Sequence, residues 1–262
     1  MTGFTERLAM RAEATGSLVC INLDPDLDRP GVSDRSASPR EAADAVVRYF
    51  SAVIERTAPY ACAYKPNFAF FLPLGADGIR ALREIRERIP REIPVILDAK
   101  VGDVGNTSEH YAQAFFDTWD FDAVTVNPYL GEDGLAPFFE RADRGVIVLA
   151  KTSNPGSGDF QDLALEAGSE PLSDRVVRRV VEWDQRYPAA AGLVVGATYP
   201  GHLARIRRLA PTLPILLPGV GAQGGDVAAS VRAGCDATGG GLLVSAGRSI
   251  IYAGTGAGFA DA

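Results

Sequence analysis

Short apolar runs recur along the chain at fairly regular intervals, and each is bounded by Gly, Pro or polar residues. Most of their residues are β-branched or aliphatic, which is typical of strands buried on both faces of a parallel sheet. We therefore predict eight strands, at Ser17–Leu23, Ala61–Lys65, Pro94–Leu97, Ala123–Val126, Gly145–Ala150, Gly192–Val195, Pro214–Leu217 and Gly241–Val244.

The segments between these runs carry apolar residues at helical spacing, as Val46 and Phe50 do within Pro39–Arg56. This pattern predicts helices at Pro39–Arg56, Asp77–Arg88, Thr107–Thr118, Asp133–Arg141, Asp174–Trp183, His202–Leu209 and Gly225–Ala233. Thr107 and Ser108 are residue types that commonly cap a helix, so we expect one of them at the N-cap of the third helix.

The alternation of strand and helix repeats eight times in 262 residues, so each unit averages about 33 residues, close to the ~30 of a βα unit. This order predicts the α/β class and a single (β/α)8 TIM barrel that fills residues 1–262 as one domain. A doubly wound open sheet is the alternative. No linker or change in composition indicates a second domain.

Composition narrows the choice of partners and location. A chain that is 47% hydrophobic and 23% charged is an ordinary globular protein and not a disordered one. The net charge of −7 and the lack of a basic run argue against a nucleic-acid partner. Three widely spaced cysteines are typical of a reducing compartment, and no apolar stretch suggests a leader or a membrane span. We expect a cytoplasmic protein without a membrane partner.

Charged side chains gather where two predicted strands end. Lys65 ends the second strand, and Asp98, Lys100 and Asp103 follow the third. In an extended strand, residues two apart face the same side, so Asp98 and Lys100 can both face the mouth of a barrel, where catalytic groups lie. Opposite charges in alternation keep each other ionised. A structural salt-bridge network is the alternative, but two lysines directed at one barrel mouth favour a catalytic site.

Glycine-rich turns follow the last two predicted strands. The segment 218–226 (PGVGAQGGD) contains Gly219 and Gln223, and Gly247 and Arg248 follow the eighth strand. Backbone N–H groups and an Arg fork at this place in a barrel favour phosphate binding over ordinary turns with a surface Arg. We interpret Lys151 as a solvated loop charge, and no Cys, His or carboxylate spacing indicates a metal site.

The segment 98–107 (DAKVGDVGNT) resembles the DxKxxDxxxT signature of orotidine 5′-phosphate decarboxylases. Further segments resemble this family in the same order, namely 23–25 (LDP), 65–67 (KPN), 152–156 (TSNPG), 218–226 (PGVGAQGGD) and 247–249 (GRS). The resemblance is greatest to a bacterial branch with a longer loop after the fifth strand. It covers most of the chain.

The resemblance implies a reaction and its catalytic residues. Orotidine 5′-monophosphate would become uridine 5′-monophosphate (UMP) and CO₂, the last step of de novo pyrimidine synthesis, with no metal and no organic cofactor. Lys100 would donate the proton to C6, and Asp98 would lie beside the leaving carboxylate. Lys65 would contact the ribose and orient Asp98. Asp103 would complete the array from a neighbouring subunit, so a homodimer is implied.

The resemblance also implies substrate contacts. Asp24 would accept hydrogen bonds from the ribose hydroxyls, and Thr107 would touch the ribose across the subunit interface. Ser153 would bind the amide edge of the pyrimidine. The residues expected at the phosphate end of the substrate are Gly219, Gln223, Gly247 and Arg248.

Two alternatives stay open from the sequence. One is a metal-using sugar-phosphate decarboxylase or hexulose-phosphate synthase, because these enzymes share the DxKxxD motif. The other is a barrel that binds a phosphorylated ligand without catalysis. Loss of orotidine 5′-monophosphate in the presence of EDTA would favour the decarboxylase over both alternatives.

Overall fold

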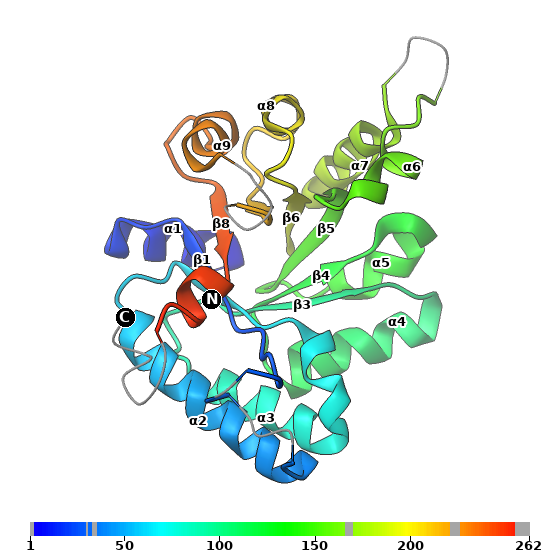
Figure 1. The fold of residues 1–262 in the computed structure, drawn as a ribbon. Helices are drawn as coiled ribbons and strands as arrows, with labels where there is room; N and C mark the ends of the chain where they lie inside the picture. The colour runs from blue at the N-terminus through cyan, green and yellow to red at the C-terminus, as the bar shows by residue number, and fades with distance from the viewer. Residues whose placement is uncertain (1–2, 30, 33–35, 166–169, 221–225, 255–262) are drawn as a thin grey trace.

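The computed structural model describes residues 3–29, 31–32, 36–165, 170–220 and 226–254. Eight parallel strands form one sheet in the order β2-β1-β8-β7-β6-β5-β4-β3 (Figure 1). The strands are β1 (Val19–Asn22), β2 (Ala63–Lys65), β3 (Ile96–Val101), β4 (Ala123–Val126), β5 (Gly145–Lys151), β6 (Ala190–Val195), β7 (Ile215–Leu217) and β8 (Leu242–Ala246). The pattern of apolar runs therefore located all eight strands.

The sheet closes on itself between β2 and β3. These two strands stand at the ends of the ladder order, and they meet through isolated bridges that pair Tyr64 with Val95 and Asn67 with Asp98. The Tyr64 N–H also donates to the Pro94 carbonyl at 3.0 Å. The predicted (β/α)8 barrel is confirmed, and the open-sheet alternative is wrong. A single domain over the whole of residues 1–262 stays a prediction.

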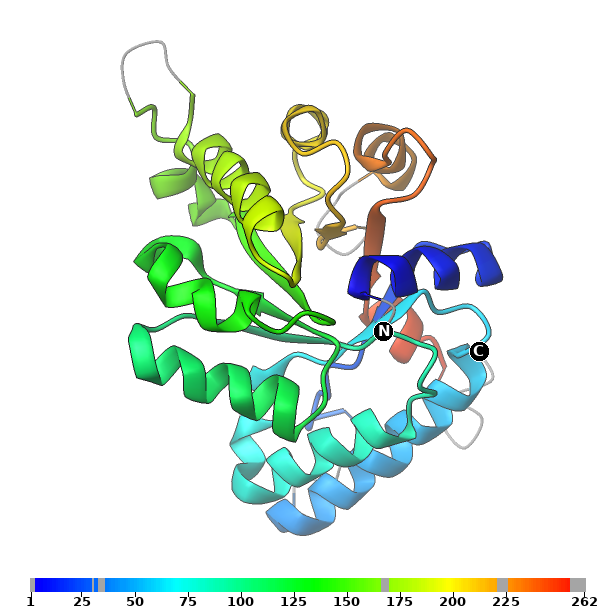
Figure 2. The same ribbon diagram turned by 180° about the vertical axis from the view of Figure 1, so that it is seen from behind.

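Helices surround the strands, as Figures 1 and 2 show from opposite sides. They are α1 (Phe4–Thr15), α2 (Pro39–Thr57), α3 (Gly75–Arg88), α4 (Gly105–Ala112), α5 (Glu132–Phe139), α6 (Gly158–Gln161), α7 (Leu172–Arg186), α8 (Pro200–Leu209), α9 (Val227–Gly234) and α10 (Arg248–Ile251). The seven predicted helices are confirmed to within a few residues, with a π-helical stretch, Gln113–Thr118, continuing α4. Within the described ranges, none of these helices has the length and apolar character needed to cross a membrane.

The predicted caps of the third helix are wrong. Helix α4 begins at Gly105, and its N-cap is Val104, which has no side-chain cap. Ser108 lies inside the helix, where its hydroxyl donates to the carbonyls of Asp103 (2.8 Å) and Gly134 (2.7 Å). It therefore ties the loop after β3 to α5 instead of ending a helix.

Strand alternation divides the core into two layers. One layer fills the barrel interior with small and branched side chains: Cys20, Ala63, Ile96, Ala123, Ile147, Val194, Leu216 and Leu243. Helix α1 covers the N-terminal end of this interior through Phe4 and Leu8, and Figure 2 brings α1 to the front. The opposite faces of the strands pack against the surrounding helices.

Polar side chains lie directly above this apolar plug. Because side chains alternate along a strand, the next inward position is two residues further on. In five of the strands that position is polar, as the sequence shows at Asn22, Lys65, Asp98, Thr125 and Ser245. The C-terminal mouth of the barrel is therefore lined by groups that can hold charge and donate hydrogen bonds.

Candidate active site

Asp98 is the centre of the polar layer. Its Oδ2 accepts a hydrogen bond from Lys65 Nζ at 2.7 Å and one from Asn67 Nδ2 at 3.4 Å. Its Oδ1 accepts from Lys100 Nζ at 2.5 Å and from Thr125 Oγ1 at 2.9 Å. Four donors from β2, β3, β4 and the loop after β2 therefore converge on one carboxylate.

Burial and charge oppose each other at this carboxylate. Burial alone would raise the pKa of Asp98, but Lys65 and Lys100 outweigh it and hold that pKa well below its ordinary value of 3.8. Burial also opposes the charge on Lys65, whose side chain is only 4% exposed. Asp98 and Asp24 outweigh this penalty and raise the pKa of Lys65. Both partners of the buried pair are therefore ionised at neutral pH.

Asp24 lies beside this pair in the loop after β1. Its Oδ1 accepts a hydrogen bond from the backbone N–H of Asn67 at 3.0 Å. Burial raises the pKa of Asp24, although Lys65 partly offsets this effect. A hydroxyl donor from a bound ligand would relieve the desolvation of this carboxylate.

Lys100 reaches Asp98 by a route that the sequence did not indicate. The β3–β4 pairing shifts register between Leu97 and Val101, and Lys100 has a left-handed backbone with φ of 51°. The Lys100 N–H donates to Thr125 Oγ1 at 3.0 Å, which holds this conformation. The predicted meeting of Asp98 and Lys100 is confirmed, but the extended strand assumed between them is wrong. Such strained backbone gathers at functional sites.

Asp103 does not join the other three charged residues within the described part of this chain. Its Oδ1 accepts from the N–H of Val104 at 2.8 Å, and no ion pair connects it to Lys65 or Lys100. Thr107 is exposed in the first turn of α4. Their expected contribution to a neighbouring subunit's site stays a prediction.

A cleft of about 890 Å³ opens next to this charged cluster. Four residues predicted to bind substrate line it, namely Asp24, Gly219, Gly247 and Arg248. Gln223 lies outside the described residues. The loops after β1, β7 and β8 thus border one cavity at the C-terminal end of the barrel.

Tyr252 connects two walls of this cleft. Its hydroxyl donates to the carbonyl of Asp24 at 2.9 Å and accepts from the N–H of Asp26 at 2.7 Å. Burial raises the pKa of Tyr252 to about 12, so this hydroxyl keeps its proton at neutral pH. Helix α10, which begins at Arg248 and is followed by Tyr252, is thereby joined to the loop that carries Asp24.

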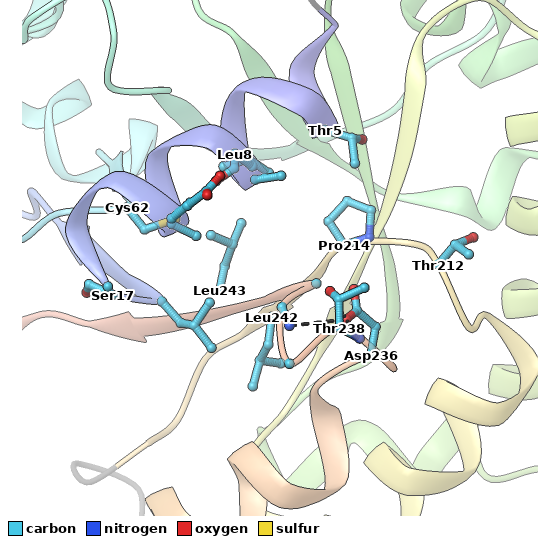
Figure 3. A pocket seen from close by; sticks show the side chains of 18 residues that line it. Thr5, Leu8, Ser17, Cys62, Thr212, Pro214, Asp236, Thr238, Leu242 and Leu243 are labelled. Carbon is cyan, nitrogen blue, oxygen red and sulfur yellow. Dashed lines mark hydrogen bonds between the residues drawn. The ribbon is translucent and has the colours of Figure 1, made fainter.

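A second cavity, of about 600 Å³, lies at the other end of the barrel between α1 and the starts of β7 and β8 (Figure 3). Leu8, Cys62, Pro214 and Leu242 are among the residues that line it, and none of the predicted site residues does. Because chemistry in barrels is carried out at the C-terminal ends of strands, we assign the candidate site to the first cleft. Among the described residues, no group of three or more His, Cys, Asp and Glu is placed to hold a metal ion.

Lys151, which we interpreted as a solvated loop charge, is buried, so that interpretation is wrong. Its side chain is 1% exposed and is paired with Asp162. Ser153, two residues further on, is half-buried against the end of β6. A β-bulge between Leu149 and Lys151 explains the error, because it changes the face of the strand on which Lys151 lies.

Comparison with known proteins shows which family has this site. The sequence matches the model of the orotidine 5′-phosphate decarboxylase / HUMPS family over residues 17–260. The chain belongs to this family. An orotidine 5′-phosphate decarboxylase of Thermomicrobium roseum is 50% identical over 258 residues, which cover 98% of this chain and 90% of that protein.

Solved structures of the family agree with the barrel described above. The OMP decarboxylase of Leishmania donovani is 40% identical with a TM-score of 0.82, and the match covers 95% of this chain and 90% of that one. The UMP synthase of the same organism is 41% identical with a TM-score of 0.86. That match covers 96% of this chain but 52% of the synthase, so this chain spans about half of its length.

The sequence analysis missed several polar residues of the site in this member of the family. Asn22, Asn67, Thr125 and Ser245 all take part in its hydrogen bonds, and Ser245 Oγ donates to Asn22 Oδ1 at 2.7 Å. A single polar residue at an inward position of an otherwise apolar strand is the signal that identifies Thr125. The same signal identifies Asn22 and Ser245.

The pKa of Asp98 predicts how stability depends on pH. A carboxyl whose pKa is lowered on folding contributes stability that is fully present above its ordinary pKa of 3.8 and is lost as the pH falls through the folded value. We expect the difference in free energy of unfolding between the wild type and Asp98→Asn to be constant above about pH 5 and to shrink below about pH 4. Urea unfolding across this range measures it.

Asp24→Asn is the matched contrast, because burial raises the pKa of Asp24. A carboxyl with a raised pKa binds its proton more tightly in the folded state. The wild type should therefore lose stability relative to Asp24→Asn as the pH rises through about 4 and above. If the difference in free energy of unfolding between the wild type and the variant changed with pH in the same direction for Asp98→Asn and Asp24→Asn, this account of the cluster would be contradicted.

Proposed function

We propose that the protein decarboxylates orotidine 5′-monophosphate to UMP and CO₂, the last step of de novo pyrimidine synthesis. The observation that carries the proposal is the buried Asp98 carboxylate held between Lys65 and Lys100 beside the cleft. The names of the relatives at 40–50% identity support the same reaction. We infer that it works without a metal or organic cofactor, in the cytoplasm.

The chemical difficulty of this reaction is the electron pair left on C6 when CO₂ departs. That pair has no carbonyl or cofactor to accept it, so a fixed charge must stabilise it. Lys100 suits this role, because its side chain is 44% exposed and its ammonium already rests on Asp98. In our proposal, Lys100 faces C6 as a cation and then delivers its proton there.

Asp98 has a double role in the proposal. It keeps Lys100 in place through their ion pair, and its negative charge lies near the substrate carboxylate that departs. Repulsion between the two carboxylates would be relieved as CO₂ forms. Lys65, underneath, keeps Asp98 ionised and is proposed to contact the ribose.

Further substrate contacts complete the proposal. We propose that Asp24 accepts hydrogen bonds from the ribose and that Ser153 binds the amide edge of the pyrimidine. Gly219, Gln223, Gly247 and Arg248 would hold the phosphate. The phosphate does not react, so its binding energy can serve to orient the base over Lys100.

We further propose a homodimer in which Asp103 and Thr107 reach the partner's site. The apolar side chains of Val104, Tyr129 and Leu130 are exposed on the neighbouring loops after β3 and β4. Exposed apolar groups that gather beside polar ones are typical of a protein interface. A second copy of the chain seated here would bring Asp103 close to its active site.

Lys100→Ala is the direct test of the reaction. We expect the wild type to consume orotidine 5′-monophosphate in the presence of EDTA and the variant to lose about 10³-fold or more in kcat, because both the proton donor and the cation at C6 are gone. A spectrophotometric assay measures turnover, and circular dichroism checks the fold of the variant.

Other outcomes would point to the alternatives. Turnover that stops with EDTA and returns with a divalent metal ion would favour a metal-using enzyme of the family. UMP binding without any release of CO₂ would favour a non-catalytic barrel. Substantial turnover by Lys100→Ala would refute the proposed mechanism.

Mixed dimers test whether Asp103 acts across the interface. Combining inactive Lys100→Ala and Asp103→Asn subunits creates one site per mixed dimer with both residues intact. Random exchange should therefore restore about a quarter of wild-type activity. Verified mixed dimers that stay inactive would show that Asp103 does not act in the partner's site.

Arg248→Ala tests the phosphate contact. Losing a charge-assisted hydrogen bond of about 1.5–3 kcal/mol should weaken UMP binding about 10- to 100-fold. Uridine, which has no phosphate, should bind as before. Inhibition constants for both ligands measure the preference, and an unchanged preference for UMP over uridine would rule out this role.

A further inference from the structure

Lysine is rare in this chain, and its placement is not random. Lys65, Lys100 and Lys151 are the only lysines among the 26 basic residues, and the rest are arginines. All three lie at the C-terminal ends of strands, in β2, β3 and β5. The first two meet at Asp98, whereas the third has no part in the mechanism proposed above.

A bulge turns Lys151 away from the barrel interior. Leu149 pairs with Val194, but Lys151 pairs with Val195, so β5 has one more residue than β6 between these pairs. Leu149 and Val194 belong to the interior layer, and Val195 belongs to the layer under the helices. The bulge therefore places the Lys151 side chain outside the barrel, beneath the loop that follows β5.

The partners of Lys151 all lie in that loop or next to it. Its Nζ donates to Ser157 Oγ at 3.0 Å and to Asp162 Oδ2 at 2.7 Å. It also lies 5.3 Å from the centre of the Tyr199 ring. An ammonium that is 1% exposed would be costly without such partners. The side chain thus connects the first residue of the segment 151–162 to its last.

Hydrogen bonds between Thr152 and Gln161 also hold the two ends of this loop together. The Thr152 N–H donates to Gln161 Oε1 at 2.8 Å, and Gln161 Nε2 donates to Thr152 Oγ1 at 2.9 Å. Ser153 follows immediately. A Cβ added to Gly196 would lie 2.8 Å from the backbone of Ser153, so the two residues are in close contact. Ser153 is therefore enclosed between the end of β6 and a loop closed by Lys151.

We propose that Lys151 is a positioning residue for recognition of the pyrimidine base. By pairing with Asp162 it holds Thr152 and Ser153 at the place where the base binds, without touching the ligand itself. This inference rests on the proposed function, because that proposal assigns the base contact to Ser153. A residue that merely stabilised the fold would not distinguish a ligand with a base from one without.

Calorimetric binding of UMP and of ribose 5-phosphate, which lacks the base, tests the idea. We expect Lys151→Met, which keeps the apolar stem, to weaken UMP binding about tenfold and to leave ribose 5-phosphate within about twofold. Gly196→Ala, which displaces Ser153 directly, should show the same selectivity. Arg179→Met, an exposed cation on α7, is the control and should change neither affinity.

Asp162→Asn provides a second route if Lys151→Met does not fold. It is nearly isosteric, and its side chain is 43% exposed. It should lower UMP affinity selectively. Where Lys151→Met does fold, the double variant should lose no more than Lys151→Met alone, because both substitutions break one pair. Additive losses would contradict the pairing.

Parallel loss of both ligands would assign Lys151 a structural role and overturn the inference, as would unchanged UMP affinity. If the wild type binds UMP no better than ribose 5-phosphate, there is no base contact for Lys151 to position, and the inference is also overturned.

Failure of the proposed function would give a different result. The wild type would then bind UMP but not decarboxylate orotidine 5′-monophosphate, and the binding comparison would still decide the role of Lys151.

Discussion

The carboxylate of Asp98 is a buried charge that lies directly above the apolar layer of the barrel interior. Such a charge persists only where its lost hydration is replaced, and four donors replace it here. This requirement determines much of the surrounding structure. Lys65 is ionised below it, Thr125 is polar within an apolar strand, and Lys100 takes an unusual backbone conformation to reach it.

The ion pair between Lys65 and Asp98 spans β2 and β3, the two strands between which the barrel closes. Strands β2 and β3 meet through isolated bridges, whereas each of the other neighbouring strand pairs in the described chain forms a ladder of at least two consecutive paired residues. The ion pair between Lys65 and Asp98 and the bridge between Asn67 and Asp98 both join these strands. Closure of the barrel and assembly of the charged cluster therefore depend on the same residues.

Periodicity was enough to predict the strands, the main helices and the barrel, because burial on both faces of a strand and on one face of a helix leaves a regular pattern. It also placed Lys65, Asp98 and Lys100 at one mouth. It could not show the register shifts in β3 and β5, since extra residues in one strand have no local signature. The shift in β3 includes Lys100 with its left-handed backbone, and the bulge in β5 hid the burial of Lys151. Whether Asp103 belongs to a partner's site depends on a second chain, which no pattern within one chain describes.

The scarcity of lysine determines where the protein reacts with reagents that modify amines. Two of its three ε-amines are enclosed, at 4% and 1% exposure, and only that of Lys100 is open to solvent, at 44%. A reagent that acylates or alkylates amines thus encounters a single accessible lysine side chain, and it is the one assigned to the reacting carbon. Labels, cross-linkers and surfaces that couple through lysine would attach at the mouth of the barrel. The abundant arginines elsewhere are inert to such chemistry.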